Sequence, residues 1–237
     1  MSDKAGAGTT QVDVVVIGAG AAGLMCAATA AYQGHRVLVL DHANKAGKKI
    51  LMSGGGRCNF TNLNTTPEHF VSANPHFCKS ALKRYTPWHF LELVERHGIE
   101  HVEKAPGQLF CADSAKDILG MLLTECEWAG AEIRLKTGIR RVRQTESGFS
   151  LSTSAGTVQC GKLVVACGGL SIPTMGATGF GYQLAEQFGL NVLPTRAGLV
   201  PFTLQPDDKA WLAALSGIST DVVAQTSAAS FAEPMLI

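Results

Sequence analysis

The sequence is poor in charge and shows no long block of one sign. Only 16% of its 237 residues are Asp, Glu, Lys or Arg, against about 25% in an average soluble domain. The 20 cations and 19 anions nearly cancel, and no run of like charge exceeds the pairs Lys48–Lys49 and Arg140–Arg141. Phosphate binding along a nucleic acid needs a concentrated basic face. The composition therefore predicts no nucleic-acid partner, while 46% hydrophobic residues provide a core and exclude bulk disorder.

The sequence also lacks paired cysteines, clustered histidines and an unbroken apolar span. Its seven cysteines include no C-x-x-C pair, so we expect no disulfide framework or zinc centre, and reduced thiols favour a cytoplasmic location. Its seven histidines have no ligand spacing, which predicts no metal site. The run from Val14 to Gly34 is uncharged, but three internal glycines divide it. We therefore expect a strand and a helix there rather than a membrane span.

Glycine is abundant and clustered, and the first cluster lies in a strand–helix–strand pattern. Of 26 glycines, 14 fall within residues 18–56 and 168–189. Val12–Ile17 is a continuous apolar run, typical of a buried parallel strand. An Ala-rich helix is expected over Ala21–Gln33, and a second buried strand over Arg36–Leu40. Together these segments predict a βαβ unit with a right-handed crossover.

The turn of this unit, Gly18-Ala19-Gly20-Ala21-Ala22-Gly23, matches G-x-G-x-x-G. In this pattern the first glycine permits the tight turn, the second lets the backbone approach a pyrophosphate, and the third lets the helix pack on the sheet. The helix N-terminus adds N–H donors and a partial positive charge. Asp41 follows the second strand, where its carboxylate would bind a ribose 2′-OH and repel a 2′-phosphate. The unit therefore predicts FAD or NAD rather than NADP.

The rest of the chain predicts more helices and a group of short strands. Residues 44–64 are rich in Gly and Asn and are expected to form a long loop. Helical patterns cover 74–98, with a start signal at Thr86-Pro87, and a second helix runs to Ala129 from an N-cap at Asp113 or Ser114. An antiparallel meander is expected at residues 133–136, 139–144, 149–153 and 157–160. A buried strand at 163–166 and a helix at 180–188 follow, and the composition changes after Pro194.

These elements predict an α/β fold with a Rossmann-like, mostly parallel sheet and an antiparallel β-meander. Two features favour FAD over NAD as its ligand. The segment Ser53–Asn62 holds three consecutive glycines beside polar residues, and such a loop can follow an extended ligand with its N–H groups. The meander is typical of FAD-binding flavoproteins. An NAD-dependent dehydrogenase stays open as an alternative if the Ser53–Asn62 segment is incidental.

Three segments, Val15–Leu24, Gly47–Asn62 and Ala166–Pro173, resemble the bacterial BaiN/RdsA flavoprotein family, also described as YhiN-type or aminoacetone-oxidase-like. The similarity runs from about Asp13 to Leu204. The resemblance implies a noncovalent FAD, a two-dinucleotide-binding-type fold and oxidoreductase chemistry on a small-molecule substrate such as an amine or an enone-type compound. It also implies NAD(P)H as an electron donor.

Family members have an inserted, β-rich substrate-side domain, so the resemblance also predicts boundaries. We expect a mobile tail over 1–11, an FAD-binding domain over 12–195 and the beginning of the inserted domain over 196–237. On this expectation the chain stops inside the inserted domain, and the C-terminal return segment of the FAD domain is absent. The parallel sheet would then lack its last strand, and FAD affinity would be reduced.

Carried over residue by residue, the resemblance assigns three parts of the site. The glycine loop would hold the pyrophosphate, Asp41 and His42 would lie at the adenosine, and Ile139 would offer backbone contacts to the adenine. Phe180 stands where many relatives have an acid. The full set of expected cofactor-binding residues is Gly18, Ala19, Gly20, Ala21, Ala22, Gly23, Asp41, His42, Lys48, Lys49, Gly55, Gly56, Arg57, Cys58, Asn59, Ile139, Ala166, Gly168 and Gly169.

The sequence identifies no catalytic residue and no oligomeric state. Arg57 is the best candidate for a cation near flavin N1, with a phosphate clamp as its alternative role. The neighbouring Arg57 would lower the thiol pKa of Cys58, but no resolving cysteine follows, so a thiolate role is not the favoured interpretation. A third interpretation, besides a flavin enzyme and an NAD enzyme, is a non-catalytic module that binds a dinucleotide without turnover.

Overall fold

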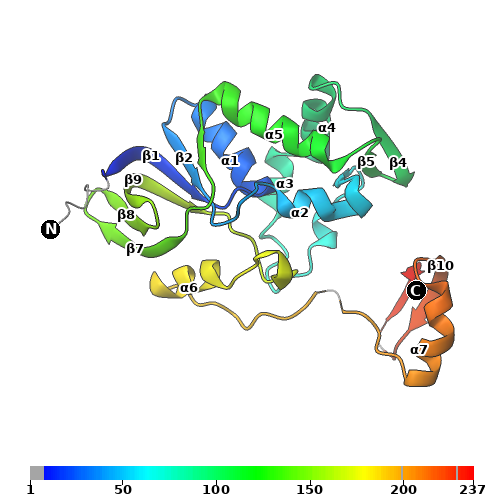
Figure 1. Ribbon diagram of the computed structural model, residues 1–237. Helices are drawn as coiled ribbons and strands as arrows, with labels where there is room; N and C mark the ends of the chain where they lie inside the picture. The colour runs from blue at the N-terminus through cyan, green and yellow to red at the C-terminus, as the bar shows by residue number, and fades with distance from the viewer. Residues whose placement is uncertain (1–7, 199, 228) are drawn as a thin grey trace. The chain divides into compact units, whose positions relative to one another are not determined.

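The computed structural model describes residues 8–198, 200–227 and 229–237. The chain divides into two compact units, the first ending at Val192 and the second beginning at Leu193. The first unit holds β1 to β9 and α1 to α6, and the second holds α7 and a β-hairpin (Figure 1). All the residues predicted to bind a cofactor lie in the first unit.

The first unit is built on a sheet whose described strands follow the order β6-β2-β1-β9-β8-β7. The neighbours β6, β2, β1 and β9 pair in parallel, whereas β8 pairs antiparallel to both β9 and β7. The long strand β9 belongs to both parts, because Gly156–Cys160 pairs with β8 while Val158–Val165 pairs with β1. The strand bounds are β1 Thr10–Ile17, β2 Val37–Leu40, β6 Glu132–Arg134, β7 Ile139–Thr145, β8 Gly148–Thr153 and β9 Gly156–Val165.

The sheet is buried on both faces, which explains the unbroken apolar run of β1. Val14 and Val16 point into a core formed with α1 (Ala21–Tyr32) and α5 (Ala115–Ala129). Val15 and Ile17 point into a second core with residues of β7, β8 and α6 (Phe180–Gln187). Because successive side chains of a strand alternate between faces, a strand covered on both sides needs apolar residues throughout. Figure 1 shows α1 and α5 together on one side of the sheet.

The helices begin and end where the local sequence predicts. The Ser114 hydroxyl accepts a hydrogen bond from the Lys116 N–H at 3.2 Å and caps α5, which ends at Gly130 in a left-handed conformation. The N-cap is therefore Ser114 rather than Asp113. Helix α4 (Pro87–Arg96) starts after Thr86 with proline in its first turn, and Gly98 beyond its end has a φ of 65°.

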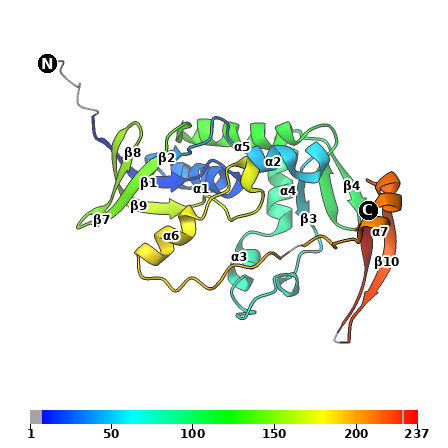
Figure 2. The ribbon, with the colours of Figure 1, turned by 60° about the horizontal axis from the view of Figure 1, so that its bottom comes forward.

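Beside the main sheet, the first unit carries a smaller sheet and several short helices. The small sheet is antiparallel with the order β3-β5-β4 (Figure 2). Its strands are β3 Asn59–Asn62, β4 His101–Ala105 and β5 Gln108–Cys111. The short helices are α2 Lys48–Met52, η1 Ser53–Gly56, η2 Pro67–His69, α3 Lys79–Arg84 and η3 Pro173–Met175. Neither β4 nor β5 was predicted from the sequence.

Four local expectations are corrected by these elements. Thr10 and Gln11 pair with β9, so the expected tail is ordered at its end. The segment 133–136 belongs beside β2 in parallel as β6, not in the antiparallel meander. The two strands expected at 157–160 and 163–166 form the single strand β9. The expected loop 44–64 contains α2, η1 and β3. Within the helical stretch 74–98, the predicted start signal at Thr86-Pro87 is where α4 begins after α3.

The second unit contains α7 (Pro206–Leu212), η4 (Ala213–Leu215) and an antiparallel hairpin. The hairpin joins β10 (Ser219–Gln225) to β11 (Ser230–Leu236), with Val222 opposite Glu233. Within the described part of the chain, no helix has both the length and the apolar character required to cross a membrane.

Candidate functional site

The three glycines of the first loop occupy three different environments, as the motif requires. Gly18 has a φ of 109°, and a Cβ there would meet the backbone of Ala166. A Cβ on Gly23 would overlap the carbonyl oxygen of Gly18, so only glycine lets α1 pack this closely against the loop. At Gly20, no described protein atom lies within 4 Å of where a Cβ would be. The backbone of Gly20 is therefore open to a ligand.

The start of α1 faces this open space with its backbone donors. Gly20 is the N-cap, and among the described residues no side chain caps the helix. Gly20, Ala21 and Ala22 line a cavity. The first N–H groups of a helix have no partner within the helix, and they favour an anion. The loop and the helix start therefore form an anion-binding site.

Asp41 is tied to the glycine loop from the end of β2. Its carboxylate accepts hydrogen bonds from the backbone N–H of Ala19 at 2.7 Å and of Ala43 at 2.8 Å. The imidazole of His42 lies 3.7 Å from the same carboxylate. Each carboxylate oxygen can accept more than one hydrogen bond, so Asp41 fixes the loop and keeps acceptor capacity for a hydroxyl. The backbone carbonyl of Asp41 accepts from the Thr137 N–H at 2.8 Å, which brings the start of β7 to the site.

Two cavities meet at this point. The smaller, of about 220 Å³, is lined by the ends of β1 and β2, by residues 137–139 at the start of β7, and by Phe180. The larger, of about 450 Å³, runs along the glycine loop and the start of α1 to α2, β3 and α5. Both cavities share a wall formed by Gly18, Asp41, His42, Cys167 and Gly176. They therefore form one continuous groove with the helix start beside it.

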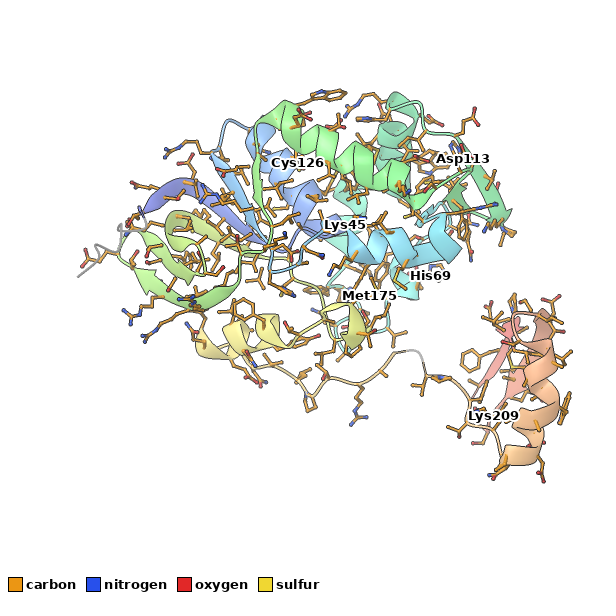
Figure 3. All side chains as sticks on the ribbon, in the orientation of Figure 1. Lys45, His69, Asp113, Cys126, Met175 and Lys209 are labelled. Carbon is orange, nitrogen blue, oxygen red and sulfur yellow. The ribbon has the colours of Figure 1, made fainter. Side chains whose placement is uncertain are left out.

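The larger cavity has a cationic side and an apolar side. Lys45, Lys48 and Lys49 line it, and Asp41 is the only acid among the described lining residues. Figure 3 labels Lys45 and, from the other side of the groove, Met175. The ammonium group of Lys49 donates to the Ser171 hydroxyl at 3.0 Å and to the Gly169 carbonyl at 3.4 Å. This contact links α2 to the second glycine cluster.

The apolar side consists of side chains from three elements and lies beyond the cationic side. Phe60 of β3, Phe90 of α4, and Ile118 and Leu122 of α5 line the cavity, and the two phenyl ring centroids are 6.0 Å apart. Such a mixture of apolar walls and a few polar groups is typical of a small-molecule site.

The segment Ser53–Asn59 makes a tight double turn rather than an extended loop. Gly54 and Gly55 have left-handed backbone angles inside η1, and a Cβ on Gly54 would lie 2.8 Å from the Phe110 ring. Cys58 and Asn59 line the larger cavity, but the exposed Arg57 does not. Five of the expected residues line neither cavity: Gly23, Gly55, Gly56, Arg57 and Gly169.

The expectation for the Cys58 thiol is wrong. Burial raises the pKa of Cys58, and the hydrogen bond with Ser53 lowers it only in part. Desolvation disfavours the thiolate, and the side chain forms part of the wall of the larger cavity. Cys167, which also lines the groove, has its pKa raised by burial as well. Neither thiol is suited to act as a nucleophile at neutral pH.

Several residues of the groove were missed by the sequence analysis. Phe60, Phe90, Ile118 and Leu122 come from elements far apart in the chain, and no spacing rule groups them. Gly176 carried a usable signal, because it lies in the second glycine cluster; its φ is 91°, and a Cβ there would approach His42. Among the described residues, no group of three or more His, Cys, Asp or Glu side chains could hold a metal ion.

Comparisons with known proteins place this groove in context. A family model described as "HI0933-like protein Rossmann domain" matches residues 12–234. The chain is 53% identical over 225 residues to a protein of Escherichia coli K12 named ribosomal RNA dihydrouridine synthase, covering 94% of this chain and 56% of that protein. It is 28% identical over 211 residues to the 3-dehydro-bile acid delta(4,6)-reductase of Clostridium scindens, covering 87% of this chain and 50% of that protein.

The chain therefore spans about half the length of these curated relatives. Among solved structures, glycine oxidase from Geobacillus kaustophilus has a similar fold, with a TM-score of 0.54 and 20% identity over 77% of this chain and 59% of that one. This likeness confirms the predicted Rossmann-like α/β fold.

Proposed function

Because the chain belongs to the HI0933-like protein Rossmann-domain family, whose relatives include a named reductase, we propose that it binds FAD and serves an FAD-dependent reductase. The observation that carries the proposal is the continuous groove formed by two cavities that share Gly18, Asp41 and Gly176. An extended dinucleotide with a pyrophosphate in its middle suits two cavities joined beside a helix N-terminus.

Each part of the groove has a chemical partner in FAD. The smaller cavity would take the adenosine, with Asp41 at the ribose and the backbone of Ile139 at the adenine. The open backbone at Gly20 and the start of α1 would take the pyrophosphate. Lys48 and Lys49 would add positive charge beside it.

The larger cavity would take the flavin half, and bound FAD would supply the hydride-transfer chemistry. The chain's own residues would orient the flavin and exclude water from one side of it. Phe60, Phe90, Ile118 and Leu122 form that dry wall. Arg57 is exposed and does not line the cavity, so the cations available to the bound cofactor are those that line it, Lys45, Lys48 and Lys49.

For the substrate, we propose a carbon–carbon double bond conjugated to a carbonyl, and specifically the uracil ring of an RNA uridine. The support is the name of the relative that is 53% identical to this chain over 225 aligned residues, a ribosomal RNA dihydrouridine synthase. Dihydrouridine differs from uridine by two hydrogens across the C5–C6 bond, so NAD(P)H and one proton would balance the reaction. This proposal departs from the expectation of no nucleic-acid partner, which rests on the small net charge and on the absence of long runs of like charge.

A visible absorption spectrum of the purified chain, with and without added FAD, tests the cofactor. We expect flavin bands and FAD as the released nucleotide by mass spectrometry. A colourless protein that binds NAD would instead support the dehydrogenase alternative. The matched variant is Gly20→Ala, whose new methyl group would project into the space proposed for the pyrophosphate.

Incubation with NADPH and a uridine-containing ribosomal RNA fragment tests the substrate. We expect digestion products heavier by two hydrogens at uridine, measured by nucleoside mass spectrometry. A chain that binds FAD but leaves every uridine unreduced would support the non-catalytic interpretation and contradict the proposed substrate.

A further inference from the structure

The charges of the chain are distributed very unevenly along it. The 50 residues 42–91 contain seven Lys or Arg residues but only one acid, Glu68. The remaining residues contain 13 cations and 18 acids. The net charge of +1 is therefore the sum of a segment with a formal charge of +6 and a remainder of the chain with a formal charge of −5.

The cations of this segment are available to a partner. Lys79, Lys83 and Arg84, on α3, are all exposed. Among the described residues, every pair of a Lys or Arg with a carboxylate within 4.0 Å involves Arg36, Arg96 or Arg134, which lie outside the segment. No described carboxylate lies within 4.0 Å of these cations, and only at longer range does Lys79 interact with Glu68. They therefore keep most of their attraction for an anionic ligand.

Exposed aromatic rings accompany these cations. Phe77 and Trp88, on either side of α3, are 81% and 60% exposed. Tyr85 is also exposed and stacks on the ring of His89, with centroids 5.6 Å apart and an angle of 24° between the planes. Large aromatic side chains are usually buried to a high degree, so several exposed ones in a short basic segment require an explanation.

We propose that Phe77, Lys79, Lys83, Arg84 and Trp88, here called the basic aromatic surface, bind single-stranded RNA next to the flavin half of the groove. Proteins that bind single strands combine cations that follow the phosphates with aromatic rings on which bases stack. The inference rests on the proposed uridine substrate and adds where the RNA strand is held. Helix α3 (KSALKR) has Leu82 as its one large apolar residue, so it offers no broad apolar face to a membrane surface.

The position of the surface suits this role. Trp88 and Phe90 lie within one turn of α4 and project from different sides of it, Phe90 into the wall of the larger cavity and Trp88 to the surface. Helix α3 directly precedes α4 in the chain (Figure 2). A strand held by its phosphates on α3 can stack one base on Trp88 and place a neighbouring base toward the cavity. Reduction of a uracil needs such an unstacked base.

The test is the affinity of the chain for a fluorescein-labelled, uridine-containing 12-nucleotide RNA, measured by anisotropy at several salt concentrations. The variant Lys79→Gln/Lys83→Gln/Arg84→Gln should bind about tenfold or more weakly near 0.1 M salt, with the slope of log K against log salt reduced by about 2. Trp88→Ala should bind about fivefold or more weakly, because a stacked base is lost.

Two matched controls distinguish the effect of this surface from the effect of removing positive charge, or an exposed aromatic ring, anywhere on the chain. Arg140→Gln/Arg141→Gln/Arg143→Gln removes the same three charges from β7, and Trp211→Ala removes a ring that is 62% exposed in the second unit. Both controls should stay within about twofold of the unchanged chain. Equal losses in a variant and its control would overturn the surface, and so would variants that bind RNA as tightly as the unchanged chain.

The same samples separate this inference from the proposed function. If the chain binds FAD but substitutions in the basic aromatic surface leave RNA affinity unchanged, the proposed RNA-binding role of this surface is wrong, whereas the cofactor proposal stands. If no flavin binds but the variants lose RNA affinity as expected, the surface stands and the reductase proposal fails. Binding to phosphatidylglycerol vesicles without binding to RNA would also overturn the surface.

Discussion

The glycines at positions 20 and 23 allow stability and ligand binding to be separated by two substitutions of one methyl group each. Both residues lie at the start of α1. A Cβ on Gly23 would overlap the Gly18 carbonyl oxygen, whereas a Cβ on Gly20 would meet no described atom within 4 Å. We therefore expect Gly23→Ala to damage the fold and Gly20→Ala to damage ligand binding.

The magnitudes follow from these surroundings. The Gly18 N–H donates to the Leu40 carbonyl at 2.8 Å, so the oxygen that a Cβ on Gly23 would meet belongs to a fixed turn. Overpacking costs about 1–3 kcal/mol and sometimes more, and the helix propensity of alanine returns about 1 kcal/mol. Because this overlap is severe, we expect a net loss of about 2 kcal/mol in the free energy of unfolding.

Gly20→Ala should change the free energy of unfolding by less than about 1 kcal/mol. Alanine is a poorer N-cap than glycine, which lowers the free energy of unfolding by less than about 1 kcal/mol. Alanine also lowers the conformational entropy of the unfolded chain, which raises the free energy of unfolding by a similar amount. The added methyl group would, however, occupy the space proposed for the pyrophosphate. Misfit of one such group changes affinity about tenfold or more.

Urea unfolding followed by circular dichroism, together with FAD titration, measures both effects. We expect a lower midpoint at unchanged slope for Gly23→Ala and a normal midpoint with weak FAD binding for Gly20→Ala. The reasoning is refuted if Gly23→Ala unfolds at the midpoint of the unchanged chain, or if Gly20→Ala binds FAD with unchanged affinity.

Three further predictions concern buried polar groups. Burial alone would raise the pKa of Glu125, but hydrogen bonds from His97, Tyr32 and Arg96 outweigh it and lower the pKa. Glu125→Gln should therefore lower the free energy of unfolding by about 2 kcal/mol at neutral pH. The difference between the variant and the unchanged chain should shrink as the pH falls below the usual glutamate pKa, because the carboxylate is then protonated. Acid titrations of both proteins check this. Asp41→Asn should lose one of its two backbone hydrogen bonds, which lowers the free energy of unfolding by about 1–3 kcal/mol, and it should also weaken FAD binding. Urea unfolding measures the change in stability, and unchanged stability would contradict the described role of the carboxylate. Burial raises the pKa of Cys111 and of Cys126 to about 11, so both thiols should resist iodoacetamide at pH 8 until urea is added, as peptide mass spectrometry would show.

Local patterns in the sequence predicted the central part of the fold. The apolar runs before Gly18 and before Asp41 predicted β1 and β2, because a strand buried on both faces has no polar positions. The capping residue Ser114 and the terminal Gly130 bound α5 closely, since helix ends depend on neighbouring residues only. The spacing of the glycine loop likewise predicted which glycine packs and which stays open.

Long-range pairing could not be predicted in the same way. In the small sheet, β3 pairs with β5 across about 50 residues of sequence. The strands β4 and β5 form a local hairpin, but each is too short for a clear alternating pattern. The placement of β6 depended on β2 rather than on its own residues. At the site, net charge gave no indication of the basic segment 42–91, because acids elsewhere in the chain balance it.

The central place of β1 has a consequence for how the protein forms during synthesis. β1 pairs on one side with β2, which follows it closely, and on the other with β9, whose last residue Val165 is about 125 residues beyond Leu40. At a translation rate of about 5–20 residues per second, the edge of β1 that pairs with β9 stays unpaired for about 6–25 seconds after β2 has been synthesised. The groove, whose walls also need Cys167 and Gly176, is among the last parts of the first unit to be completed. A nascent chain therefore displays an apolar strand edge throughout this interval, and a chaperone that binds such edges would find its substrate there.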